Sequence, residues 1–322
     1  MSLSRRVVLS LPLIGLAASV RAEAWPAKPL RMVVPYPAGG PTDVLARALA
    51  AKMGEGLGQQ IVVDNKPGGA GNIGSEIGAK AAPDGYTLTM GNNATHATNQ
   101  TLIPQTPFDA SKDFAAIGLT TTVTHVLVVH PDVPARTMQD FVTWAKAEGD
   151  KLSYASTGNG SASNLAMELF KGATGLQAVH VPYRGSAPAV QDLIGGVVRC
   201  SFQTLPSVLS QIRAGKLRGL AVSSLKRNAN LPDVPTVDET IMKGFQADAW
   251  FGLFAPARTP DDIVGRLNAE MVKALKDAAT AEVIEKAGFD ITPSNPQELA
   301  DFVKVEIVKW AKVVKDSGAK AE

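Results

Sequence analysis

The segment Arg31-Met-Val-Val-Pro-Tyr-Pro-Ala-Gly-Gly-Pro-Thr-Asp43 is the most informative part of the chain. A short apolar strand at 32–34 runs into a Pro/Gly turn, and the paired apolar residues at 44–49 predict a helix directly after it. Gly39 and Gly40 carry no side chain to shield their amides, and Pro41 suits the first helical position. The start of a helix offers unpaired N–H groups and the positive end of its dipole. The turn therefore predicts a site for a small anion such as a carboxylate.

The same arrangement recurs in the second half of the chain. A strand at 152–156 leads to Gly158-Asn159-Gly160-Ser161, and paired apolar residues at 165–170 predict the helix that follows. In open α/β sheets, ligands lie beyond the carboxyl ends of the strands. Two such turns in different halves predict a clamp that closes on its ligand by a hinge. The alternative is that both turns only connect a strand to a helix.

Short β-rich runs alternate with helical patterns along most of the chain, which predicts an α/β fold with parallel sheet. About 300 residues exceed one comfortable core, so we expect two lobes. No low-complexity linker separates the halves, and we place the crossings near residues 124 and 224. Lobe I would then contain residues 25–124 and 225–322, and lobe II residues 125–224.

The first 24 residues have the pattern of a cleavable signal peptide, with Arg5 and Arg6 before an apolar stretch too short to span a membrane. Ser4-Arg5-Arg6 also resembles a twin-arginine signal, so the export route stays open. The alternative is a buried N-terminal helix. No later run of about 18 apolar residues occurs, so we expect a soluble mature chain.

The charge and cysteine content exclude several classes of protein. Residues 1–24 carry three arginines and one glutamate, so their removal changes 32 basic against 30 acidic residues to 29 against 29. A neutral mature chain gives no electrostatic reason to bind nucleic acid or a membrane surface. The single cysteine, Cys200, cannot form an intramolecular disulfide, and its β-rich surroundings predict a buried strand position.

Motifs of catalysis and cofactor binding are weak. Gly69-x-Gly71-x-x-Gly74 matches a dinucleotide fingerprint, but four residues separate it from the preceding strand and no acid ends the next strand. The four histidines form no zinc pattern, and Ser161 lacks the Gly-x-Ser-x-Gly context of a hydrolase. A Ser/His/Asp triad assembled from distant residues stays open. We expect no catalytic residue, no metal and no cofactor.

Two charged residues have both a structural and a functional interpretation. Asp43 either supports the start of its own helix through the dipole or orders water in a pocket. Arg184, in Tyr183-Arg184-Gly185-Ser186, either pairs bidentately with a ligand carboxylate or is an ordinary solvated charge.

Eight short stretches over nearly the whole mature chain resemble the tripartite tricarboxylate transporter receptor family, also called Bug proteins. They are Trp25-Pro26-x-Lys28-Pro29, Pro35-x-Pro37-x-Gly39-Gly40-x-x-Asp43, Asn65-Lys66-Pro67-Gly68, Ala82-Pro83-Asp84-Gly85-Tyr86-Thr87, Tyr154-Ala155-Ser156-x-Gly158-x-Gly160, His180-Val181-Pro182-Tyr183-x-Gly185, Leu231-Pro232-x-Val234-Pro235-Thr236 and Trp250-Phe251-Gly252. Each stretch alone is weak, but their order and extent are specific. The resemblance implies a two-lobed periplasmic binding protein, type II-like with two strand crossovers and its ligand in the interlobe cleft. Such a receptor delivers a small, usually carboxylated, solute to the membrane permease subunits of the transporter.

The resemblance also implies a ligand held partly by backbone groups and waters between the two turns. We expect the ligand-binding residues to be Tyr36, Ala38, Gly39, Gly40, Thr42, Asp43, Thr95, His96, Ser156, Thr157, Gly158, Asn159, Gly160, Ser161, Tyr183, Arg184, Gly185 and Gln203.

The sequence departs from the family pattern in two places. Arg184 replaces a commoner Lys, and Gln203-Thr204 stands where Asp-Asn is frequent. If Gln203 reaches the pocket, a charge is missing there, which favours a dicarboxylate or an aromatic carboxylate over an amino acid. We expect a monomer. Two rival functions remain: an exported enzyme acting on small organic acids, and a ligand-loaded partner of a membrane sensor kinase.

Overall fold

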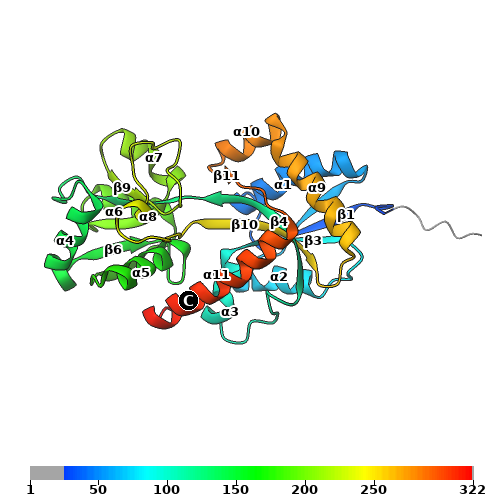
Figure 1. Cartoon of the computed structure of the whole chain (residues 1–322), viewed down its shortest axis with the longest axis horizontal. Helices are drawn as coiled ribbons and strands as arrows, with labels where there is room; N and C mark the ends of the chain where they lie inside the picture. Colours follow the sequence, from blue (N-terminus) through cyan, green and yellow to red (C-terminus); the bar gives the residue numbers. More distant parts are fainter. Residues whose placement is uncertain (1–24, 321–322) are drawn as a thin grey trace, which may run out of the picture.

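The computed structural model describes residues 25–320, which form two lobes with one β-sheet each (Figure 1). Lobe I holds the start of the described chain and most of its last third, and lobe II holds the middle of the chain, drawn in green and yellow; the last helix ends beside lobe II. The predicted two-lobed α/β fold is confirmed.

The sheet of lobe I has six strands in the order β11-β4-β10-β3-β1-β2. Strands β1, β2 and β3 are parallel, whereas β10 is antiparallel to both β3 and β4. The strands are β1 (Leu30–Val34), β2 (Ile61–Asn65), β3 (Thr87–Asn92), β4 (Phe114–Val123), β10 (Ala249–Pro256) and β11 (Asp290–Ile291). The helices are α1 (Pro41–Leu57), α2 (Asn72–Ala79), α3 (Asn99–Leu102), α9 (Asp261–Lys276), α10 (Ala278–Lys286) and α11 (Pro296–Ser317), with short turns η1 (Gly69–Gly71) and η2 (Ala94–Thr98).

The sheet of lobe II has five strands in the order β7-β6-β8-β5-β9, of which β6, β7 and β8 are parallel. The strands are β5 (His125–Val129), β6 (Ser153–Ser156), β7 (Val179–Pro182), β8 (Cys200–Thr204) and β9 (Arg218–Val222). The helices are α4 (Met138–Glu148), α5 (Ala162–Thr174), α6 (Ser186–Ile194), α7 (Leu205–Arg213) and α8 (Val237–Thr240), with a short turn η3 (Gly149–Lys151).

The chain crosses between the lobes at two places. The first crossing is Thr124, between β4 and β5. The second leads into β10 at Ala249 and not, as expected, at residue 224. Residues 225–248 instead pack on lobe II, because Thr236 pairs with the end of β9 and the ring of Phe245 stacks on Phe202 at 6.1 Å.

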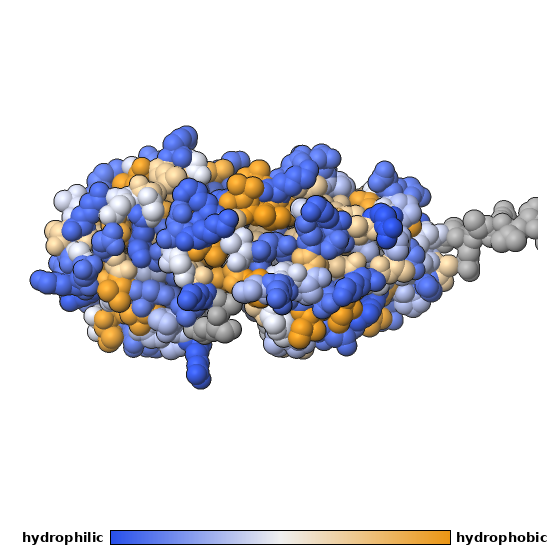
Figure 2. Space-filling model, turned by 90° about the horizontal axis from the view of Figure 1, so that it is seen from below, coloured by the Kyte–Doolittle hydropathy of each residue, from blue (hydrophilic) through white to orange (hydrophobic). Residues whose placement is uncertain are grey.

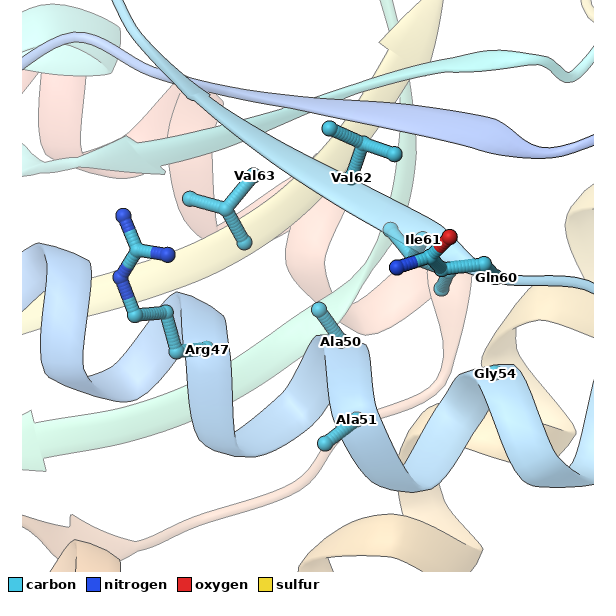
Figure 3. A pocket seen from close by; sticks show the side chains of 8 residues that line it. All are labelled: Arg47, Ala50, Ala51, Gly54, Gln60, Ile61, Val62 and Val63. Carbon is cyan, nitrogen blue, oxygen red and sulfur yellow. The ribbon is translucent and has the colours of Figure 1, made fainter.

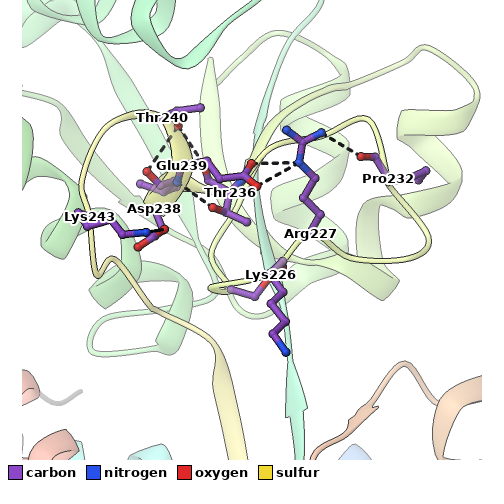
Figure 4. A network of polar contacts seen from close by, with 10 residues as sticks. Lys226, Arg227, Pro232, Thr236, Asp238, Glu239, Thr240 and Lys243 are labelled. Carbon is purple, nitrogen blue, oxygen red and sulfur yellow. Dashed lines mark hydrogen bonds and ion pairs between the residues drawn. The ribbon is translucent and has the colours of Figure 1, made fainter.

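Polar contacts hold this loop together as part of lobe II (Figure 4). Arg227 pairs with Glu239 at 3.0 Å and donates to the carbonyl oxygen of Pro232. Thr236 and Glu239 form a capping box that starts α8. The structure therefore corrects the expected lobe boundary: residues 225–248 belong to lobe II, and lobe I resumes at β10.

Helix α11 connects the two lobes, running from lobe I toward α5 (Figure 1). Glu306 fastens it to the sheet, because its buried carboxylate accepts hydrogen bonds from the indole nitrogens of Trp250, at 2.9 Å, and Trp310, at 2.7 Å. Within residues 25–320, no helix is long and apolar enough to cross a membrane.

The Gly69–Gly74 motif has a packing role. A Cβ atom on Gly74 would lie 2.7 Å from the carbonyl oxygen of Lys66 and from the Cα atom of Pro35, so α2 approaches the backbone too closely for any side chain. This close packing agrees with the tight glycine turn expected from the sequence. The signal peptide predicted at residues 1–24 lies outside the described residues.

Candidate ligand-binding site

The carboxyl ends of the parallel strands present polar groups in both lobes. In lobe I, Tyr36 follows β1, and its hydroxyl lies 3.0 Å from Asn92 Nδ2 at the end of β3. In lobe II, Ser156 ends β6 and lies opposite Pro182, the last residue of β7. Since parallel strands end at the same edge of a sheet, each lobe gathers its turns at one edge.

The turn before α1 is held by the carboxylate of Asp43. Gly39, with φ 79°, donates its N–H to Asp43 Oδ2 at 2.9 Å, and Arg47 donates to the same oxygen at 2.8 Å. Asn65 donates to the other oxygen at 2.9 Å. Burial alone would raise the pKa of this carboxyl, but the hydrogen bonds from Arg47, Gly39 and Asn65 outweigh it and lower the pKa to about 2.

The turn before α5 uses the same device with a neutral side chain. Gly160, with φ 67°, donates its N–H to Asn164 Oδ1 at 2.9 Å. Asn164 donates in turn to the hydroxyl of Tyr154 at 2.7 Å, and Tyr154 donates to Glu168 at 2.5 Å. Asp43 and Asn164 are both the third residue of their helix, and each glycine precedes the N-cap. Sequence reasoning missed Asn164, although its spacing of four from Gly160 repeats that of Asp43 from Gly39.

This arrangement changes which groups remain to bind an anion. The amides of Gly39 and Gly160 are already bound within the protein, contrary to the expectation that they face a ligand. The remaining candidates are N–H groups at the first turn of each helix, such as Thr42 in α1, which have no acceptor in the helix. An exposed Ala38 and a half-buried Gly40 leave the first turn accessible.

The second turn lies against lobe I. A Cβ atom on Gly160 would lie 2.4 Å from Leu102 Cδ2 at the end of α3, so lobe II contacts lobe I at this turn. Seen from below, the surface forms a notch between the lobes (Figure 2). Beside the second turn, Asn159 lines a pocket of about 350 Å³ together with His180 and the end of α11.

Four predicted residues have side chains that are buried or bonded to other residues of the protein. Thr95 and His96 are fully buried in lobe I, where His96 stacks on Phe254 at 4.0 Å and burial lowers its pKa to about 3. Gln203 is fully buried and donates to Ser201 at 2.9 Å.

Tyr183 directs its hydroxyl to Asp192 at 2.6 Å. Burial, with this hydrogen bond to a carboxylate, raises the pKa of Tyr183 to about 12. The backbone of Tyr183 still lies beside the second turn, since a Cβ atom on Gly158 would be 3.7 Å from its carbonyl oxygen.

The other predicted residues of the second turn also bond to one another. Ser156 Oγ accepts the N–H of Gly158 at 3.1 Å and lies 2.6 Å from His180 Nε2. Thr157 accepts or donates a hydrogen bond with Ser163, and Ser161 caps α5. His180 also stacks on Tyr154 at 4.9 Å, a role that its sequence position did not indicate.

Arg184 and Gly185 lie in the short segment between β7 and α6, and the Arg184 side chain is exposed. Cys200 is buried in β8 as predicted, and burial raises the pKa of its thiol to about 12.

A further pocket, of about 440 Å³, lies between α1 and the edge strand β2 of lobe I (Figure 3). It is separate from the two turns described above. Ala50, Ala51 and Gly54 leave room beside Val62 and Val63. The guanidinium of Arg47 at one end already pairs with Asp43. Among the described residues, no group of three or more His, Cys, Asp or Glu side chains is placed to hold a metal ion.

Two lobes joined by two crossings, with polar turns at the strand ends of each sheet, form the architecture of a periplasmic-type solute-binding protein. The model of the tripartite tricarboxylate transporter family receptor matches residues 45–319. The chain belongs to this family of receptors, and its function is to capture a solute for a tripartite tricarboxylate transporter.

Three solved structures have similar sequences and folds. The periplasmic binding protein BugD is 35% identical, with a TM-score of 0.71 over 92% of this chain and 100% of that one. Rpa4515 from Rhodopseudomonas palustris, solved with adipate, is 35% identical, with a TM-score of 0.75 over 92% and 99%. MatC from the same organism, solved with bound malate, is 33% identical, with a TM-score of 0.71 over 90% and 100%.

Proposed function

We propose that this receptor binds a small dicarboxylate or aromatic carboxylate between the turns that begin α1 and α5. The observation that carries the proposal is the repeated device in which a helix residue, Asp43 or Asn164, fixes a glycine turn at the end of a strand. Malate and adipate in the two neighbours are both dicarboxylates, which supports this ligand class. The receptor acts as a periplasmic monomer after removal of residues 1–24, and it delivers the solute to the permease subunits.

The helix dipoles alone cannot supply the free energy of ligand binding. Micromolar affinity needs about 8 kcal/mol, whereas one helix terminus contributes roughly 0.3–1 kcal/mol. Charge-assisted hydrogen bonds, at roughly 1.5–3 kcal/mol each, and burial on closure supply the rest. The clamp therefore needs both lobes to contact the anion.

The proposal is tested with a panel of carboxylates by thermal shift, calorimetry and turnover assays. We expect malate, adipate or an aromatic acid to stabilise the protein without product, while the matched dimethyl esters do not. Product formation would favour the exported enzyme, and stabilisation by the esters would exclude recognition of the anion. A sensor role is separated by transport assays in a deletion strain, where uptake of the bound acid should be lost.

Gly40→Val tests the first turn directly. Gly40 has φ −78°, which any residue adopts, and a Cβ atom there would lie 3.4 Å from its nearest neighbour. A branched side chain should therefore shield the α1 amides and weaken binding at least tenfold while the melting temperature changes little. Unchanged affinity would mean that the turn is only structural. Gly160 does not offer an equally clean test, because its φ of 67° and its contact with Leu102 would also strain the fold.

Arg184 is the proposed cation of lobe II. A guanidinium pairs with a carboxylate through two parallel hydrogen bonds, which a lysine ammonium cannot reproduce. Arg184→Lys should therefore weaken binding by about 1–3 kcal/mol, roughly five- to a hundredfold, as measured by calorimetry. Arg184→Ala should cost at least as much. Unchanged affinity in both variants would assign the charge to the solvated surface.

A further inference from the structure

A pair of carboxyl groups lies where the chain crosses between the lobes. Asp248 immediately precedes β10, and Asp290 begins β11 on the other side of β4. Thr124, the first crossing, donates its hydroxyl to Asp290 Oδ2 at 3.1 Å. Both carboxyl groups therefore belong to the hinge and lie outside the proposed ligand site.

Asp248 is buried in the crossing, with 8% of its surface exposed. Ser223, which directly follows β9, donates its hydroxyl to Asp248 Oδ1 at 2.5 Å. Burial raises the pKa of Asp248 to about 7; the hydrogen bonds from Ser223 and Gln246 oppose this rise, and the charge of Asp290 adds to it.

Asp290 is hydrogen-bonded to lobe II as well as to the first crossing. Asn228, in the loop of lobe II, donates to both of its carboxylate oxygens at 3.3 Å. Asp290 also lines a groove of about 760 Å³ between the lobes, whose walls include Pro206 of α7 and Glu285 of α10. The distance between these walls depends on the angle between the lobes, so the hydration of Asp290, the neighbour of Asp248 at the crossing, depends on it too.

Two further ionisable groups lie near Asp248, one in lobe II and one on α11. His125 is fully buried, and its backbone N–H donates to the hydroxyl of Ser223. Burial lowers the pKa of its imidazole to about 4, so the ring stays neutral near pH 7. Lys309 of α11 lowers the pKa of Asp248 and donates to the carbonyl oxygen of Gln246 at 3.2 Å. Lys309 is itself paired with Glu306.

We propose that the protonation state of Asp248 sets the balance between lobe orientations, so that the hinge responds to the pH outside the cytoplasm. The neutral acid fits the buried crossing and avoids repulsion from Asp290. The carboxylate favours orientations in which the two groups separate or gain water. A lower pH therefore favours the orientation described here, and a higher pH populates others.

The lobe angle can be followed by fluorescence energy transfer in the unliganded protein. Lys146→Cys on α4 and Lys276→Cys at the end of α9 place dyes on exposed sites of different lobes. Cys200 does not compete for the dyes because it is buried and its thiol pKa is raised. We expect a sigmoidal change in transfer efficiency between about pH 5.5 and 8.5, centred near pH 7.

Three variants decide whether Asp248 causes this change. Asp248→Asn should abolish it and hold the efficiency at its low-pH value, whereas Asp262→Asn, an exposed control in α9, should leave it unaltered. Asp290→Asn should move the midpoint to lower pH, because it removes a like charge, and Ser223→Ala should move it to higher pH, because it removes a donor to the carboxylate.

A flat wild-type profile, or a transition that survives in Asp248→Asn, would overturn the proposal. If circular dichroism shows that Asp248→Asn does not fold, the test rests on the opposite midpoint shifts expected for Asp290→Asn and Ser223→Ala. The absence of both shifts would overturn the proposal. No solute is present, so the result is independent of the proposed ligand.

Discussion

Asp43 and Asn164 occupy the same helical position and bind the same kind of glycine amide, but only Asp43 is charged. Because the folded state lowers the pKa of Asp43 from 3.8 to about 2, its stabilising contribution is present above about pH 4 and is lost as the pH falls toward 2. Asp43→Asn should lower the free energy of unfolding at neutral pH by about 1–3 kcal/mol and remove part of the acid dependence. Urea denaturation at several pH values measures both effects.

The matched control for that variant is Asp150→Asn, at an exposed position in η3 of lobe II. It should leave the free energy of unfolding nearly unchanged. Equal stability of Asp43→Asn and wild type at neutral pH would mean that Arg47 and Asn65 hold the turn without the charge.

Among the elements, the contact of α2 with the β1 turn gives a prediction about glycine. Gly74→Ala would place a Cβ atom 2.7 Å from two backbone atoms, so we expect a loss of about 1–3 kcal/mol in urea denaturation. Gly172→Ala in α5 meets nothing within 4 Å and should stabilise the protein by about 0.5–1 kcal/mol. Similar effects of both substitutions would show that helix propensity, and not close packing, governs the Gly69–Gly74 motif.

The regular elements were predictable because apolar spacing is a local property. The strand and helix around each glycine turn follow from residues within about ten positions, and both were found. The loop at 225–248 was misplaced because Phe245 reveals its partner, Phe202, only in three dimensions. The burial of His96 among aromatic rings and of Gln203 within β8 likewise depends on packing between distant segments, which spacing does not encode.

At the level of the whole molecule, the contact between Leu102 of α3 and Gly160 before α5 links the two lobes. Gly160→Ala should clash with Leu102 and oppose closure, which would weaken ligand affinity at least tenfold, or about 1.4 kcal/mol. Leu102→Ala in the same protein should recover the part of this loss that comes from the clash, while the strain of an alanine at φ 67° remains. Small-angle scattering with ligand should rank the variants by compactness in the same order as their affinities. A double variant no tighter than Gly160→Ala would refute a role of this contact in closure.

Glu306 joins two tryptophans beside the hinge region: Trp250, the second residue of β10, and Trp310, on the helix that reaches toward lobe II. Indole emission depends on the polarity and hydrogen bonding around the ring. The chain contains four tryptophans, and two of them share this one carboxylate. The receptor thus carries its own optical reporter, and solutes can be screened by a change in native emission with no label attached.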